Sequence, residues 1–103
     1  MDIHFLLHGQ HFVWDSEKAT SNAGKHGVRF ETACQVFFDR FIHIEDAGVD
    51  EEDRDAAIGM TDWMLFLVVH IQLRHFQRED ETIRIISARP ATAHERKTYE
   101  DTE

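Results

Sequence analysis

The sequence predicts an α+β domain: a short strand, two helices, a four-stranded antiparallel meander sheet and a C-terminal helix. Three patterns predict it. Apolar residues recur with a helical period over residues 30–38, alternation with period two begins after Asp39, and a helix-capping signature follows Pro90. A chain of 103 residues is the size of one domain. We therefore expect a single domain over 1–103, with 1–10 as an N-terminal extension and 11–101 as the folded part.

The first elements should be a short strand and a helix. Residues 11–14 favour a strand, and Asp15 has the side chain of a helix N-cap, with Glu17 in the favourable first turn. We expect the helix to end near His26, because Gly27 suits the left-handed conformation that closes many helices.

A second helix is predicted over residues 30–38. Its apolar stripe consists of side chains at helical spacing, namely Phe30, Ala33, Cys34, Phe37 and Phe38. We assign this stripe and Trp14 to the core, which favours a packing role for Cys34 over a nucleophilic one. A single cysteine also excludes an intrachain disulfide and a multi-cysteine metal site.

Four strands joined by short connections should follow, over residues 41–46, 55–61, 63–76 and 82–88. The third lies in the sheet interior, because residues 64–71 are almost wholly apolar. Sequential strands so joined usually pair antiparallel. Pro90 should end the ladder, since it has no amide hydrogen. Thr92 and Glu95 then match a capping box for a last helix that ends near Asp101.

Composition limits the class of function. The chain has 11 basic and 20 acidic residues, a net charge of −9, so it lacks the overall basic character of many nucleic-acid-binding proteins. The acidic excess is concentrated in residues 45–55, which leaves room for a basic pocket elsewhere. We find no signal-peptide pattern and no apolar run of bilayer length. We therefore expect a cytoplasmic protein that does not bind membranes.

Several segments resemble the BrnT-type ribonuclease toxins of bacterial type II toxin–antitoxin pairs. They are FVWDSEKATSNAGKHGVRFETACQVFFD at 12–39, DRDAAIG at 53–59, MLFLVVH at 64–70 and TIRIISARPATAHERKTYE at 82–100. They follow the family's order, and the joined WDxxK, KHGV and IRIISAR strings are a specific combination. The chain departs from the family in a longer hairpin at 71–81, in the segment 1–10, and at Pro90, Ala93 and His94, where the family often carries Lys or Arg.

The resemblance implies a fold like that of RelE-type microbial ribonucleases and the cleavage of RNA. We expect this cleavage to use no metal or other cofactor. It also implies neutralisation by a cognate antitoxin that carries a ribbon-helix-helix DNA-binding domain. A homodimer and a toxin–antitoxin hetero-oligomer both remain open.

Metal-independent RNA cleavage needs proton transfer and stabilisation of the charge that builds on phosphate. The 2′-hydroxyl attacks the adjacent phosphorus, and the 5′-oxygen leaves. Arg suits phosphate binding because its planar fork matches two oxygens, and His or Lys suits proton transfer. The family-like segments supply five candidate catalytic residues: Lys25, His26, Arg54, Arg84 and Arg89.

Each candidate also has a structural interpretation. Lys25 and His26 lie where cations favour a helix C-terminus, and the acidic neighbours of Arg54 offer it ion pairs. Arg84 could be a solvated residue on an outer strand face. Strict alternation places Arg84 and Arg89 on opposite faces, so both reach one phosphate only if the strand ends or bulges near Ala88.

Two other functions remain open. A catalytically weakened binding module that keeps the fold and the antitoxin interface would suit the net charge of −9 and the missing basic residues near Pro90. A metal-binding protein would require His4, His8 and His11, spaced as on one helical face, to converge on one ion. We predict no metal site there, because no carboxylate or Cys accompanies them in a recognisable motif. For His70 we expect a partly buried, hydrogen-bonded side chain.

Overall fold

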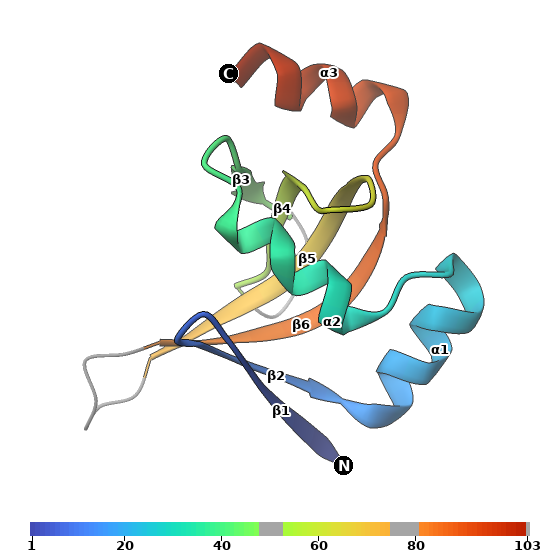
Figure 1. The fold of residues 1–103 in the computed structure, drawn as a ribbon, viewed down its shortest axis with the longest axis vertical. Coiled ribbons are helices and arrows are strands. Elements are labelled where there is room, and N and C mark those ends of the chain that lie inside the picture. The colour runs from blue at the N-terminus through green and yellow to red at the C-terminus, as the bar shows by residue number, and fades with distance from the viewer. Residues whose placement is uncertain (48–52, 75–80, 103) are drawn as a thin grey trace.

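The computed structural model describes residues 1–47, 53–74 and 81–102, and these form a six-stranded mixed sheet with helices on both faces (Figure 1). The middle of the predicted acidic loop (48–52) and the tip of the predicted hairpin (75–80, which includes His75) lie outside the described residues. The elements are β1 (Asp2–Leu7), β2 (Gln10–Asp15), α1 (Ser16–His26), α2 (Phe30–Ala33), the 3-10 helix η1 (Cys34–Phe38), β3 (His43–Asp46), β4 (Asp55–Met60), β5 (Leu65–Arg74), β6 (Glu81–Pro90) and α3 (Ala93–Thr102).

The predicted four-stranded antiparallel sheet is only part of the observed one. Strands β3 to β6 pair antiparallel with their sequence neighbours, and β5 is interior, as the apolar run predicts. However, β2 adds to β6 in parallel, and β1 pairs antiparallel with β2, so the strand order is β1-β2-β6-β5-β4-β3. The parallel pair has no local sequence signal, because most of the chain lies between its two strands.

Residues 2–7, which precede the family-like segments, thus form the edge strand β1. A two-residue turn at His8 and Gly9 joins β1 to β2, with φ values of 48° and 82°. Positive φ at both central residues gives the twist that a tight hairpin needs. His8 is an unusual residue for this conformation, so the residue types at positions 8 and 9 do not predict the turn.

Helix α1 follows its predicted capping. Asp15 accepts a hydrogen bond from the Lys18 amide (3.0 Å), and Gly27 is left-handed with φ 69°. The buried Asn22 side chain then joins α1 to β6. Its amide nitrogen donates to the carbonyls of Val28 (3.0 Å) and Ala88 (2.9 Å), and its oxygen accepts from the Ala88 amide (3.0 Å). This side chain therefore satisfies the β6 backbone beyond the short β2–β6 pairing.

The predicted second helix is α-helical only over its first turn and continues as the 3-10 helix η1. The tighter period of a 3-10 helix turns Val36 into the core, while Phe38 is 43% exposed, so the assignment of Phe38 to the core is wrong. Close packing accompanies this change. A Cβ on Gly59 of β4 would lie 2.7 Å from Val36 Cγ1, so η1 sits directly on the strand backbone.

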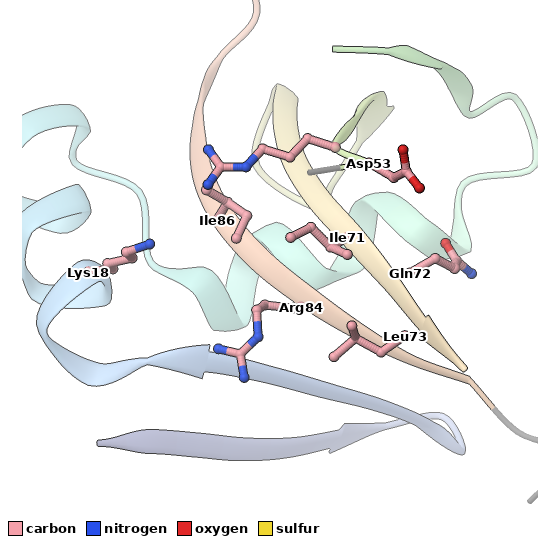
Figure 2. Close-up of a pocket in the computed structure, with 8 residues that line it drawn as sticks. Lys18, Asp53, Ile71, Gln72, Leu73, Arg84 and Ile86 are labelled. Carbon is pink, nitrogen blue, oxygen red and sulfur yellow. The ribbon is translucent and has the colours of Figure 1, made fainter. Parts of the chain in front are cut away.

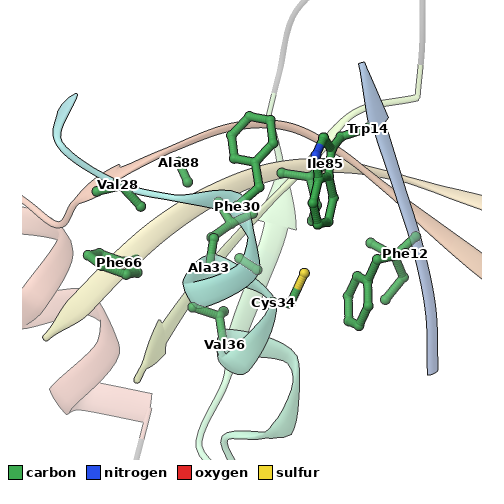
Figure 3. Close-up of a cluster of buried hydrophobic side chains, with 13 residues drawn as sticks. Phe12, Trp14, Val28, Phe30, Ala33, Cys34, Val36, Phe66, Ile85 and Ala88 are labelled. Carbon is green, nitrogen blue, oxygen red and sulfur yellow. The ribbon is translucent and has the colours of Figure 1, made fainter. Parts of the chain in front are cut away.

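Two hydrophobic clusters lie on opposite faces of the sheet. The larger joins α2 and η1 to the sheet and includes Trp14, Phe30, Phe66 and Ile85 (Figure 3). The smaller joins Tyr99 of α3 to β4 and the first half of β5. The Tyr99 hydroxyl also donates a hydrogen bond to Asp39 (2.6 Å), which ties α3 to the residue that follows η1.

Strand β6 runs two residues beyond the predicted end at residue 88, and the start of α3 follows its prediction. Pro90 ends the ladder as expected, as its last residue opposite Phe66, where a missing amide hydrogen costs little. The capping box is confirmed, because the Glu95 amide donates to Thr92 Oγ1 (3.2 Å) and the Thr92 amide donates to Glu95 Oε1 (2.9 Å). No helix of the described residues is long and apolar enough to cross a membrane.

Candidate functional site

An open groove of about 460 Å³ lies on the face that carries α3, beyond the part of the sheet that α3 covers. Figure 2 shows the residues that line it. Its floor is the second half of β5 and the middle of β6. Its walls come from the first turn of α1 and from the segment before β4. The lining residues are Lys18, Asp53, Arg54, Ile71, Gln72, Leu73, Arg84 and Ile86.

A β-bulge sets the direction of the arginines on β6. Val69 lies opposite Ser87 but His70 lies opposite Ile85, so Ile86 is an extra residue in β6. Arg84 lies opposite Ile71 and Arg89 opposite Leu67, and Ile71 and Leu67 are four residues apart on β5. Paired residues share a face, and so do residues an even number apart on a regular strand. The bulge therefore places Arg84 and Arg89 on the same face, which strict alternation forbids.

Sharing a face does not bring Arg89 into the groove. Its guanidinium donates to both carboxylate oxygens of Glu95 (2.7 and 2.8 Å) at the start of α3. The hydrogen bond to Glu95 raises the pKa of Arg89, and in return it lowers the pKa of Glu95 to about 2. Arg89 thus secures α3 to β6 in this structure.

Arg84 faces the groove, and its guanidinium is paired with β1. Arg84 Nη2 lies 3.0 Å from Asp2 Oδ2, and Nη1 lies 3.4 Å from Oδ1. The hydrogen bond from Arg84 lowers the pKa of Asp2, although desolvation opposes the shift. The fork of Arg84 is therefore already arranged around two anionic oxygens, which is the geometry that a phosphate would require.

Lys18 and Arg54 complete the cationic lining. Lys18 projects from the first turn of α1 toward the strand that carries Arg84 (Figure 2). Arg54 lies just before β4, where its carbonyl accepts a hydrogen bond from the Ala47 amide (2.9 Å). Sequence reasoning missed Lys18, although its signal was available as the Lys three residues after the capping Asp15 in the WDxxK string. The groove lining thus has three cations and one acid, Asp53, in a chain of net charge −9.

The structure does not bring Lys25 and His26 to the groove. Both lie in the last turn of α1, whereas Lys18 lies in the first, roughly 10 Å away along the helix axis at ~1.5 Å per residue. Of the five candidates, Arg54 and Arg84 meet in the groove, and Lys25, His26 and Arg89 do not line it. A catalytic role for those three stays a prediction.

Other residues with metal-binding or nucleophilic side chains lie elsewhere in the described parts of the chain. Over 1–47, 53–74 and 81–102 there is no group of three His, Cys, Asp or Glu residues that could hold a metal ion. His4 and His11 lie on strands and His8 in the turn, so the helical face proposed for them does not exist. Burial raises the pKa of the Cys34 thiol, which suppresses the reactive thiolate.

His70 is more deeply buried than the sequence suggested. It is fully buried, and its ring packs edge-on against Phe37 with 4.7 Å between centroids. Nδ1 lies 3.4 Å from the Val68 carbonyl oxygen, and Nε2 finds no hydrogen-bond partner among the residues that the structure describes. Burial lowers the pKa of His70, so the neutral imidazole is the form that the core accommodates.

A comparison of the sequence with models of known protein families identifies the family of this chain. The model for BrnT, the ribonuclease toxin of a type II toxin–antitoxin system, matches residues 14–95. The chain belongs to the BrnT family. Membership implies a cognate antitoxin. A search of curated proteins found no match. Every lining residue of the groove falls inside the BrnT match, whereas Asp2, His4 and His11 precede it.

Proposed function

We propose that this chain is the toxin of a type II toxin–antitoxin pair and that it cleaves RNA without a metal ion. The main support for this proposal is the groove lined by Lys18, Arg54 and Arg84, all three of which belong to the residues that match the BrnT family. We further propose a fold like that of RelE-type ribonucleases, action in the cytoplasm, and inhibition of growth or translation as the result of cleavage.

The proposed reaction is a transfer within the RNA chain. The 2′-oxygen bonds to the adjacent phosphorus and gives up its proton, the bond between phosphorus and the 5′-oxygen breaks, and the 5′-oxygen gains a proton. The products are a 2′,3′-cyclic phosphate and a 5′-hydroxyl end. Negative charge grows on the two non-bridging oxygens during attack. The Arg84 fork would bind both oxygens, and Lys18 and Arg54 would add positive charge beside it.

The partner in this proposal is an antitoxin with a ribbon-helix-helix DNA-binding domain. We expect it to cover the groove, because blocking phosphate access is the direct way to silence this site.

A second candidate is a catalytically weakened module that keeps the fold and binds the antitoxin. One observation favours it. Asp2 already occupies the Arg84 guanidinium, so an RNA phosphate must displace a resident carboxylate.

The test is cleavage of a defined RNA by the purified protein in the presence of a strong chelator, with analysis of the new ends. We expect a cyclic phosphate end, and we expect Arg84→Ala to reduce the rate by about a hundredfold or more, as loss of one preorganised charge-stabilising donor does. Arg96→Ala, an exposed change on α3, is the matched control and should retain activity. Cleavage that needs a divalent metal would contradict the proposed mechanism. The absence of any cleavage, with normal antitoxin binding, would favour the binding module.

A further inference from the structure

Two histidines from β1 and β2 lie on the groove face of the sheet. Arg84 of β6 lies opposite Val13 of β2, and Val13 lies opposite His4 of β1. Because directly paired residues share a face, Arg84, Val13 and His4 form one row across three strands. The Arg84–Asp2 ion pair supports this orientation independently, since Asp2 and His4 are two residues apart on β1.

His11 belongs to the same face. It is two residues from Val13 on β2 and lies opposite Leu6 of β1, so it is the diagonal neighbour of His4. Diagonal residues on paired strands lie roughly 7–8 Å apart, within reach of one substrate group. His4 and His11 are both exposed, whereas Val13 between them and Arg84 is 3% exposed and forms the floor.

The cationic residues of the groove leave one chemical requirement unmet. Lys and Arg side chains ordinarily remain protonated at neutral pH, so they stabilise phosphate charge but do not readily accept the 2′-hydroxyl proton. Imidazole is the side chain that ordinarily exchanges a proton between pH 5 and 8. Cleavage needs one group that takes a proton and another that gives one.

We propose that His4 and His11 are the acid–base pair of the cleavage reaction, an inference that rests on the proposed RNA-cleaving function. One neutral imidazole accepts the 2′-hydroxyl proton as the bond from the 2′-oxygen to phosphorus forms. The other, as imidazolium, donates its proton to the departing 5′-oxygen as the second bond breaks. Arg84 holds the phosphate between them. Both histidines lie outside the BrnT-matched range, so this pair would be a feature of this chain's own N-terminal hairpin.

Several charged groups accompany the two histidines on this side of the sheet. The charged and titratable groups on this face or beside it are Asp2 of β1, the Met1 amino group, Asp15 of β2, Lys18 of α1 and Arg84 of β6. Both of these acids are already paired, Asp2 with Arg84 and Asp15 with the Met1 amino group (3.2 Å). Both ion pairs are left unchanged in any variant that changes only the histidines.

The test compares the variants H4Q and H11Q with the control H8Q. In the parent, the His8 ring packs against Phe38 beside the turn, with 5.1 Å between ring centroids. We expect H4Q and H11Q each to slow cleavage about 10²- to 10⁴-fold, the usual range for loss of acid–base catalysis. Each should remove a different limb of a bell-shaped rate–pH profile. Binding of a 2′-O-methyl oligonucleotide, which cannot be cleaved, and the unfolding midpoint should stay unchanged. H8Q should behave as the parent.

Parent-like rates and pH profiles in H4Q and H11Q would overturn the inference while leaving RNA cleavage and the role of Arg84 intact. Loss of oligonucleotide binding in parallel with loss of cleavage would also overturn it, because the histidines would then be binding residues. A parent protein that cleaves no RNA would refute the proposed function, and the acid–base pair with it.

Discussion

Arg84 and Asp2 are 82 positions apart in the chain, yet Arg84 Nη2 lies 3.0 Å from Asp2 Oδ2 on the groove face of the sheet. A carboxylate and a phosphate both present two oxygens to a guanidinium fork. If Arg84 binds a substrate phosphate as we propose, Asp2 occupies the position that the phosphate would take. The contact depends on β1, which precedes the part of the chain that matches the BrnT family.

Replacement of Asp2 by Asn should strengthen the binding of a non-cleavable oligonucleotide. The expected gain is roughly two- to fivefold, the ratio that corresponds to usual strengths of exposed ion pairs, and it should shrink at high salt. Fluorescence anisotropy at two salt concentrations measures it. Glu17→Gln, an exposed change on α1 with the same loss of charge, is the control. Equal gains in both variants would mean that only net charge matters.

The Arg89–Glu95 pair should make the free energy of unfolding depend on pH in the acidic range. The hydrogen bond from Arg89 lowers the pKa of Glu95 from 4.5 to about 2. Because the folded-state pKa is depressed, the stabilisation is present above about pH 4.5 and is lost as pH falls toward 2. Glu95→Gln should lower the free energy of unfolding at pH 7 by about 1–3 kcal/mol and flatten its fall below pH 4.5. Chemical denaturation at several pH values measures this.

The control for that pair is Glu100→Gln, an exposed change on the same helix. It should leave both the free energy of unfolding and its acid dependence nearly unchanged. If Glu95→Gln and Glu100→Gln behaved alike, the anchoring role of Arg89 would be refuted.

His70 should make the free energy of unfolding depend on pH as well, more weakly and at higher pH than the Arg89–Glu95 pair does. Burial lowers the folded-state pKa of His70 below its usual 6.5, although the Val68 carbonyl and Asp55 oppose the shift. The unfolded chain then binds a proton that the folded core excludes, so stability falls as pH drops below about 6.5. The slope for one such group is at most ~1.4 kcal/mol per pH unit. His70→Leu, which keeps an apolar group of similar size beside Phe37, should reduce this slope between pH 7.5 and 5. An unchanged slope would assign the effect to other groups.

Gly59 should tolerate no side chain, in contrast to Gly24. A Cβ at Gly59 would meet Val36 Cγ1 at 2.7 Å and the Val36 carbonyl oxygen at 2.9 Å, so Gly59→Ala should destabilise by about 1–3 kcal/mol. A Cβ at Gly24 of α1 would meet no described residue within 4 Å, and Gly24→Ala should stabilise the helix by up to about 1 kcal/mol. Urea denaturation of both variants measures the contrast. Similar effects of the two changes would contradict the close approach of η1 to β4.

The sequence by itself determined the features that depend on a few neighbouring residues. The caps at Asp15 and Gly27 and the capping box of Thr92 and Glu95 involve contacts within four positions, so their residue types predict them. The antiparallel order of β3 to β6 follows similarly from short connections between alternating segments. The resemblance to the BrnT family could also be recognised from the sequence, and the family model matches residues 14–95.

Only the tertiary structure decided which charged side chains meet. The extra residue Ile86 reverses the expected face of Arg89 relative to Arg84, and the bulge appears only in the pairing of β6 with β5. The parallel pairing of β2 with β6 brings the first strands, and with them Asp2, beside Arg84. Lys18 enters the groove while Lys25 does not, because the two lie at opposite ends of one helix. Each outcome depends on contacts between segments far apart in the chain, which no local pattern of residues encodes.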